Sequence, residues 1–553
     1  MKRFLTLCLA AAVLMTGCVK VDNSLGKGLV DKSLLFDTYT VEFPLEEITL
    51  ERASDLSAFS DSRLTLGAIR DDCFGLTTRE AAFTLVPVLD TLDLGTNPVA
   101  QSFRIYFEAD TVSLADETQR HIIQSIYVTE LEEAVPTSIT STNQPLKHGT
   151  ARVTDGIPVY NGVSGALTFN FTKEFAQKYV DVVKKLGPVL KDRQSDNGVD
   201  HYDDFVKELP GIHLRTDVPS GLGGRINLFD FSCLSVESSY YTRNNNVAAL
   251  TVHSTWNGVQ KDSTFLFLPG ETEFVDEAAY LAANTKFYQY CYNYTYHSTE
   301  DRPAVDYIYV EGGGGLKPVI HAQELQEKTR AAILAHGGNP DKVAIIKATI
   351  ILPFEMPEDY KELDRFPSVL SPTIRVKSES DEGEESISFA GLTDASVSSE
   401  NQGNIDRSNL WYAPDITYHL QELLTRTDLD SESDGDIWLL TIHTEQVADA
   451  NGSAYDNEYY QNLLYASYYN ALYGGGYGGY YGGYGGYGYG NNYSNYYSYM
   501  MLAQMMAASS QQTYSYTTEL DKDRYYKAVM NGPASNGEAG VPFFRVTFAI
   551  PQD

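Results

Sequence analysis

Alternation of hydrophobic and polar residues with a period of two dominates this chain. The clearest runs are residues 103–107, 167–171, 265–267 and 544–550, which place apolar side chains at every second position. Such runs indicate β-strands with one buried face. Many short runs divided by Gly, Pro, Asn and Asp are typical of antiparallel sandwiches. We therefore predict a mainly β protein with two antiparallel β-sandwich or jelly-roll-like domains and a few short helices.

Three segments break this alternation and predict helices. Thr172 is a favourable N-cap for a helix whose apolar positions recur at helical spacing, and Gly187-Pro188 would end it. A second helix is expected over residues 322–335, before a glycine pair, and a third over 415–426, after Pro414. We expect these helices to bridge strands or to cover the ends of the sandwiches.

The chain of 553 residues is too long for one ordinary domain. The polar gap at residues 297–303 is the best boundary, which gives β domains at 38–300 and 301–553. The second domain would contain a low-complexity insert at 470–504, which is rich in Gly and Tyr.

The N-terminus has the pattern of a bacterial export signal. Two basic residues precede a short apolar core, and Gly17 stands directly before Cys18. The core is shorter than the roughly 20 residues of a membrane span. We predict a lipoprotein signal peptide at residues 1–17, cleavage before Cys18, acylation of that cysteine, and a polar tether at 18–37.

The net charge of −33 restricts the partners of the protein. Binding to nucleic acid depends on Lys and Arg that neutralise phosphates, so a chain this acidic is a poor match for it. Anionic lipid headgroups are unfavourable for the same reason. We predict no nucleic-acid partner.

The low-complexity insert combines three properties suited to contact with another surface. Glycine gives backbone freedom, tyrosine gives contact area at a low entropic cost, and methionine adapts to irregular surfaces. A disordered insert without a partner and contact with a membrane interface are the alternatives. The candidate partner-contact residues are Tyr477, Tyr480, Tyr484, Tyr487, Met500, Met501 and Met505.

Tyrosine also occupies every second position from residue 288 to residue 296. On a strand these rings share one face. They could form aromatic packing across strands, which the sequence favours, or a flat platform on which sugar rings stack. The candidate glycan-stacking residues are Tyr288, Tyr290 and Tyr292.

No motif supports a catalytic residue, a metal site or a cofactor. The chain has no CxxC, HExxH or GxSxG pattern. Residues 430–437 resemble the start of a calcium loop, but Thr441 occupies the twelfth position, where a glutamate is needed, so an acidic turn is favoured. The glycines at 312–315 lack the spacing of a phosphate loop and predict a turn.

Three cysteines, Cys73, Cys233 and Cys291, remain in the mature chain. One disulfide bond between two of them and three free thiols are both compatible with their spacing.

Several segments, in order, resemble a family of Bacteroidota outer-membrane lipoproteins that is defined as a domain of unknown function. The resemblance covers most of the mature chain, with Cys73 at a position where the family usually has proline, and the low-complexity insert falls outside the pattern. The segments are Asp22-Asn23-Ser24-Leu25-Gly26, shortly after Cys18, and residues 62–67, 71–75, 205–214, 309–316, 346–348 and 352–353.

The resemblance implies a β-rich protein anchored by lipid in the outer membrane, with no family catalytic residues to transfer. Lipoproteins of related bacteria often serve as accessory subunits of outer-membrane machines. The leading hypothesis is therefore a non-enzymatic structural or accessory subunit in the assembly, export or surface organisation of envelope proteins, with an outer-membrane protein as its partner. A surface glycan-binding module or adhesin is the alternative, and a hydrolase built from scattered carboxylates ranks third. The sequence leaves open whether the protein faces the periplasm or the cell surface.

Overall fold

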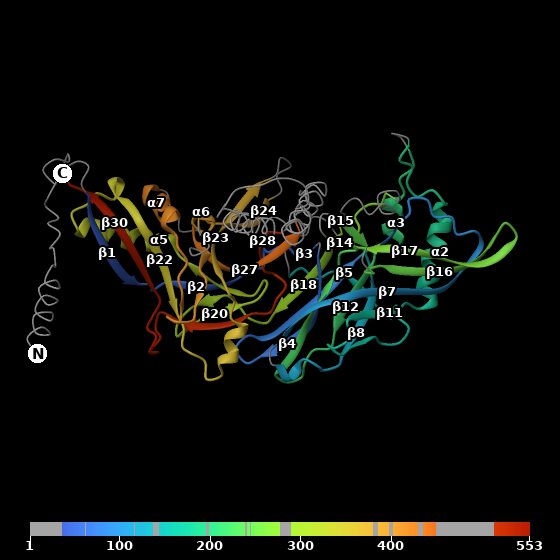
Figure 1. The fold of residues 1–553 in the computed structure, drawn as a ribbon, viewed down its shortest axis with the longest axis horizontal. Coiled ribbons are helices and arrows are strands. Elements are labelled where there is room, and N and C mark those ends of the chain that lie inside the picture. The colour runs from blue at the N-terminus through green and yellow to red at the C-terminus, as the bar shows by residue number, and fades with distance from the viewer. Residues whose placement is uncertain are drawn as a thin grey trace, which may run out of the picture.

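The computed structural model describes most of the chain from residue 36 to residue 552. Residues 61, 115–116, 136–142, 195–197, 238–239, 244, 277–288, 380–384, 398–401, 428, 430–434 and 449–513 also lie outside the description. The signal peptide, Cys18, nearly all of the tether, the low-complexity insert and Tyr288 therefore lie outside the described residues. The described part is an elongated molecule (Figure 1).

Antiparallel β-sheets are the main regular structure of the described chain, with few helices beside them, which confirms the predicted fold class. Two bodies, each with its own hydrophobic core, lie end to end (Figure 1). We call residues 59–297 the first lobe, and residues 36–52 together with 302–551 the second lobe.

Fourteen of the described strands form the sheet of the first lobe, with the main order β10-β8-β12-β5-β4-β13-β7-β16-β17-β6. β11 pairs with β7, β9 with β8, and β18 with both β3 and β5. β14 (Leu234–Glu237) and β15 (Tyr240–Arg243) form a separate ribbon. The strands of the sheet are β3 (Phe59–Ser60), β4 (Arg63–Asp71), β5 (Gly75–Phe83), β6 (Leu85–Pro87), β7 (Thr96–Leu114), β8 (Gln124–Leu131), β9 (His148–Arg152), β10 (Val159–Tyr160), β11 (Ala166–Asn170), β12 (Ile212–Thr216), β13 (Gly223–Asp230), β16 (Ala248–Trp256), β17 (Val259–Pro269) and β18 (Cys291–His297).

The core of the first lobe forms where this sheet meets helix α2 (Lys173–Leu186). The hydroxyl of Thr172 accepts a hydrogen bond from the amide of Phe175, and Gly187 ends the helix, as the sequence predicts. Phe103 of β7 lies at the centre, with its ring centroid 5.1 Å from that of Tyr179. Both side chains are fully buried, so the alternating face of β7 and the apolar face of α2 stabilise each other. α3 (Tyr202–Glu208) and the short η2 (Glu117–Gln119) complete the helices described in this lobe.

Two sheets and a separate two-stranded ribbon enclose the core of the second lobe. Apolar residues of β30 and β22 meet those of β2, β21 and β27, while helices α5 and α7 cover the core. Together these contacts give a sandwich-like arrangement.

The five-stranded sheet contains β1 (Phe36–Pro44), β30 (Phe543–Pro551), β22 (Ala344–Pro353), β26 (Trp411–Tyr412) and β25 (Ile405–Asp406). The seven-stranded sheet contains β19 (Arg302–Pro303), β2 (Ile48–Arg52), β21 (Leu316–Ile320), β27 (Ile437–Ala448), β23 (Leu370–Glu379), β24 (Glu385–Gly391) and β28 (Tyr514–Leu520). β20 (Tyr307–Glu311) pairs with β29 (Lys527–Asn531). The helices are α5 (Ala322–Ala335), α6 (Thr393–Val397), α7 (Thr417–Thr425), η3 (Pro340–Lys342) and η4 (Tyr360–Arg365).

The first two strands of the described chain belong to the second lobe, whereas the predicted boundary places residues 38–52 in the first domain. β1 pairs with β30 along its whole length, from Phe36 opposite Pro551 to Pro44 opposite Phe543. β2 pairs with β21, from Ile48 opposite Ile320. The alternating pattern identifies strands but carries no information on which distant strand will pair with them. The connection between β18 and β19 lies within the polar segment 297–303, which the sequence predicts as the domain boundary.

The described cysteines, Cys73, Cys233 and Cys291, are free thiols, and the last two are buried. Of the alternatives that the sequence leaves open, the structure shows the one without a disulfide bond. None of the helices in the described ranges is long and apolar enough to cross a membrane.

Candidate functional site

Four charged or titratable side chains with almost no solvent exposure meet where the two lobes join. Arg79 of β5 and His297 of β18 come from the first lobe, and Glu311 of β20 and Lys317 of β21 come from the second. We call these four residues the junction cluster. Burying a charge is costly unless it is paired and hydrogen-bonded, so each member has to be explained by its partners.

The carboxylate of Glu311 is the centre of the cluster and is completely buried. Its Oε1 accepts a hydrogen bond from the hydroxyl of Thr77, at 2.9 Å, and lies 2.6 Å from Nδ1 of His297. Its Oε2 accepts a hydrogen bond from the hydroxyl of Thr299, at 2.8 Å. These three partners belong to the first lobe or to the segment that leaves it, so this one carboxylate joins the two lobes. Within the second lobe, Oε2 also accepts a longer hydrogen bond, at 3.4 Å, from the amide of Leu316.

These contacts determine the charge state of Glu311. Burial alone would raise its pKa, but the charge and hydrogen bond of His297, together with the two threonine hydroxyls, lower the pKa to about 2. Burial lowers the pKa of His297 itself. Glu311 therefore carries a stable negative charge at neutral pH inside the protein.

Lys317 lies inside the turn formed by the glycines at 312–315. Its ammonium group donates hydrogen bonds to the carbonyl oxygens of Glu311, of Gly313 at 2.8 Å and of Gly315 at 3.1 Å. The predicted turn between β20 and β21 is thus confirmed, and it presents carbonyl oxygens to a cation. A phosphate site would need amide N–H groups directed at an anion. Burial lowers the pKa of Lys317 to about 7.

Arg79 packs against the same turn from the first lobe. Its Nη1 donates a hydrogen bond to the hydroxyl of Thr295, while Nε and Nη2 have no hydrogen-bond partner among the described residues. Gly313 has a φ of 58°, and a β-carbon there would collide with the guanidinium group of Arg79. Glycine at position 313 is therefore required both by the backbone conformation and by the approach of Arg79.

Further contacts between the lobes surround the junction cluster. The ammonium group of Lys527, on β29, lies 2.9 Å from Asp71 and 2.6 Å from Asp72 of the first lobe. Beside these ion pairs Tyr525 packs into an apolar cluster with Ile69, Phe74, Ile226 and Leu228. The lobes are thus joined by buried ionic contacts and an apolar patch together.

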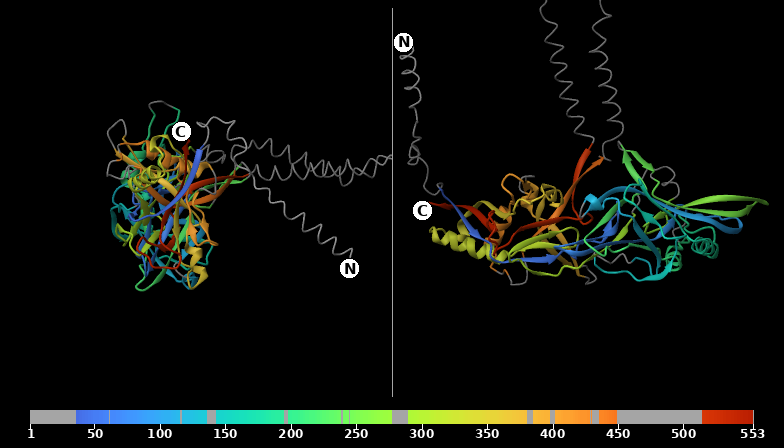
Figure 2. Two further views of the ribbon diagram at one scale, coloured as in Figure 1. Left: turned by 90° about the vertical axis from the view of Figure 1, so that its left-hand side faces the viewer. Right: turned by 90° about the horizontal axis from the view of Figure 1, so that it is seen from below.

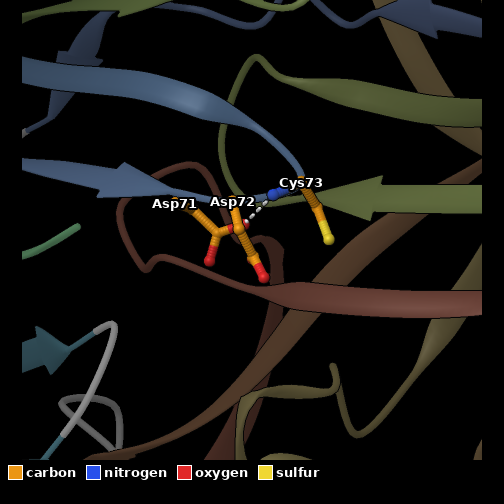
Figure 3. A group of neighbouring side chains, drawn as sticks. All are labelled: Asp71, Asp72 and Cys73. Atoms are coloured by element: carbon orange, nitrogen blue, oxygen red, sulfur yellow. Dashed lines mark hydrogen bonds between the residues drawn. The ribbon is translucent and has the colours of Figure 1, made fainter.

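Asp71, Asp72 and Cys73 bring three potential metal ligands together at the turn between β4 and β5, with their ligand atoms within 4.8 Å of one another (Figure 3). The carboxylates already hold the ammonium group of Lys527, and its hydrogen bond lowers the pKa of Asp72 to about 2. Asp71 also accepts hydrogen bonds from the amides of Cys73 and Phe74, at 2.7 and 3.2 Å. Burial raises the pKa of the Cys73 thiol, which opposes a thiolate ligand. We therefore interpret these three residues as part of the turn between β4 and β5 and of the ion pair with Lys527, and not as a metal site.

The two candidate glycan-stacking residues that are described lie in different surroundings. Tyr292 is buried, its hydroxyl donates a hydrogen bond to the carbonyl oxygen of Gln144, and its ring lies 5.5 Å from that of Phe59. Tyr290 is 39% exposed. Tyr292 therefore takes part in aromatic packing, and Tyr290 alone of this pair presents its ring to solvent.

Other candidates fall in parts of the chain without a description. These are the lipidation residue Cys18, Tyr288, residues 430–434 of the acidic turn, and the partner-contact residues Tyr477, Tyr480, Tyr484, Tyr487, Met500, Met501 and Met505.

The junction cluster could not be found by searching for motifs, because its four members come from four separate strands. Arg79 carries one signal, because the alternate positions of its strand, Thr77, Ala81 and Phe83, are uncharged. A charged residue in such a strand points to a buried partner, but its identity depends on the tertiary fold.

Comparison with protein-family models, with curated proteins and with solved structures gave no match to this chain.

Replacing Glu311 by glutamine should destabilise the protein by about 3–5 kcal/mol at pH 7, because the buried cations lose their compensating charge. The folded pKa of Glu311 lies below its ordinary value of 4.5, so its contribution is complete above pH 4.5 and is lost as the pH falls towards 2. The difference between wild type and Glu311→Gln, measured by urea denaturation, should therefore shrink over that range.

Glu42→Gln is the matched control, since Glu42 forms an ion pair with Arg545 that is about half exposed. Such pairs contribute about 0–1 kcal/mol. Equal effects of the two substitutions at pH 7, or a difference that does not depend on pH, would contradict the assigned role of Glu311.

Proposed function

We propose that this protein is a lipid-anchored outer-membrane accessory protein without enzymatic activity, which contacts a protein partner in the envelope through its low-complexity insert. The anchor is the acylated Cys18, and the fold serves as a spacer and scaffold. The observation that supports this proposal best is the position at which the insert joins the described fold.

β27 and β28 bring the two ends of the undescribed stretch 449–513 together. Ala448, the last residue of β27, lies directly opposite Tyr514, the first residue of β28. β27 pairs with β23 through residues 437–441 and with β28 through residues 442–448, so the outer part of the ribbon extends beyond the β23 ladder. Figure 2, in its right-hand panel, shows this orange and red ribbon directed away from the body. A segment rich in Tyr, Gly and Met is thus attached at the tip of a ribbon, where its insertion leaves both cores undisturbed.

The position of β1 fits an anchor at one end of the molecule. Phe36 starts β1 opposite Pro551, at the end of the elongated body farthest from α2 and the β16–β17 hairpin (Figure 1). A tether from Cys18 would reach the fold at that end. The net charge of −33 disfavours close contact with anionic headgroups, which supports a protein held away from the bilayer. Tethering also raises the effective concentration of the protein near its membrane neighbours.

Glycan binding is the second candidate function, and the exposed ring of Tyr290 supports it. The burial of Tyr292 removes one ring from the expected stacking platform. The first function is therefore favoured, because it does not depend on that platform.

The substitution Cys18→Ala should move the protein from the membrane fraction to the soluble fraction, because the acyl chains supply the membrane affinity. Fractionation of cells, with metabolic labelling by an alkyne fatty acid, measures both effects. Cys73→Ala, which changes a half-buried free thiol, is the control and should leave the label and the location unchanged. Membrane retention and labelling of the Cys18→Ala protein would count against the anchor.

Replacing residues 470–504 by a short Gly-Ser linker should abolish most crosslinks to envelope proteins and leave the melting temperature within a few degrees of wild type. The second expectation follows because the ends of the stretch are already paired by β27 and β28. Crosslinking mass spectrometry on intact cells provides the measurement. Serine substitutions at Tyr477, Tyr480, Tyr484 and Tyr487 test the side chains at constant length. An unchanged set of crosslinked partners in both variants would refute the role of the insert.

A further inference from the structure

A pocket of about 370 Å³ lies in the first lobe, between α3, β3, β5 and the start of β18. Aromatic rings form much of its wall, and one acidic residue, Glu271, lies among them. Its size is within the range of small-molecule sites, which are mostly apolar with a few polar groups. Its lining includes Phe59, Phe83, Tyr202, Val206, Glu271 and Tyr290.

Glu271 is held in place by its backbone while its carboxyl group lacks a partner. Its carbonyl oxygen accepts hydrogen bonds from the hydroxyls of Thr84, at 3.1 Å, and Tyr202, at 3.0 Å. The residue is only 4% exposed, and Oε2 has no hydrogen-bond partner within the described parts of the chain. A buried polar atom without a partner is costly and points to a group that the structure does not contain.

None of the described residues that line the pocket is a cation. Burial raises the pKa of Glu271 to about 8, and the charge of Glu273 contributes in the same direction. The nearby cation Lys191 is already paired with Glu273, at 3.0 Å, and with Asp200, at 3.2 Å. The pocket therefore disfavours anions and offers a cation an acidic group that no described cation neutralises.

The aromatic rings add a second preference for positive charge. The face of a Tyr or Phe ring attracts a cation, most strongly where water is excluded. Tyr290 and Phe83 both line the pocket, and Tyr290 is exposed while Phe83 is buried. A neutral apolar ligand would use these rings but would leave Oε2 of Glu271 without a partner.

We propose that this pocket binds a primary ammonium group carried on an apolar stem, with Glu271 as its ion-pair partner and the rings of Tyr290, Tyr202 and Phe59 around it. The ligand could be a small amine or the side chain of a lysine in another protein, which present the same chemistry. When the cation binds, the carboxyl group of Glu271 releases its proton to solvent and the carboxylate pairs with the ammonium group.

Isothermal titration calorimetry at pH 7 with hexylammonium, hexanol and hexanoate tests this proposal. Hexylammonium should bind at least about tenfold more tightly than hexanol, and hexanoate more weakly than either. Titration in two buffers with different ionisation enthalpies should show release of protons on binding at pH 7, and this release should decrease as the pH rises past about 8.

Two substitutions and two matched controls assign the effect to the pocket. Glu271→Gln should remove both the preference for hexylammonium and the proton release, and Tyr290→Leu should weaken binding several-fold. Tyr296→Leu changes a ring on β18 that is 44% exposed and does not line the pocket, so it should have no effect. Glu300→Gln, outside the pocket, controls for the loss of one acid.

A short lysine-containing peptide and its Nε-acetylated form distinguish the two sources of the ammonium group. Tighter binding of the unmodified peptide than of hexylammonium indicates a protein ligand, and weaker binding indicates a small amine. The proposal is wrong if hexanol binds as tightly as hexylammonium, if Glu271→Gln retains the preference, or if neutral monosaccharides bind in place of the amine.

Discussion

The buried carboxylate of Glu311 is the contact on which the arrangement of the two lobes depends. It belongs to the second lobe, but its hydrogen-bond partners Thr77 and His297 belong to the first, and Thr299 lies in the passage between them. A buried charge of this kind tolerates little displacement, because losing one partner leaves the group unsatisfied in a medium of low dielectric constant. The glycine turn around Lys317 and the close approach of Arg79 follow from the same requirement. The junction therefore fixes how the end of the second lobe at β1, the ribbon β27–β28 and the first lobe lie relative to one another.

Local signals predicted the parts of this fold that local physics determines. Helix α2 could be placed from Thr172 and Gly187 because capping acts within one turn. The inward faces of β7 and β30 could be identified because a strand buried on one side must alternate. The pairing of β1 with β30 could not be predicted, since many strands in the chain share the same pattern and pairing between distant segments is set by the whole fold.

The chemistry of the molecule was harder to predict for the same reason. Glu311 and His297 are close in sequence but carry no motif, and Arg79 is more than two hundred positions away. In the sequence Glu271 is one of 74 acidic residues, and only its burial and its neighbours in the structure distinguish it from the others. By contrast, the glycines at 312–315 were recognised as a turn from the sequence, although their role in holding the ammonium group of Lys317 became visible only in the structure.

The central claim is that Glu311 couples the two lobes, and hydrogen exchange measured by mass spectrometry tests it most directly. In the wild type, peptides covering β5 and β18 of the first lobe and β20 and β21 of the second should exchange with one common free energy of opening. In Glu311→Gln, protection of all four strands should fall together. A loss of protection confined to β20 and β21, with β5 and β18 unchanged, would contradict the account.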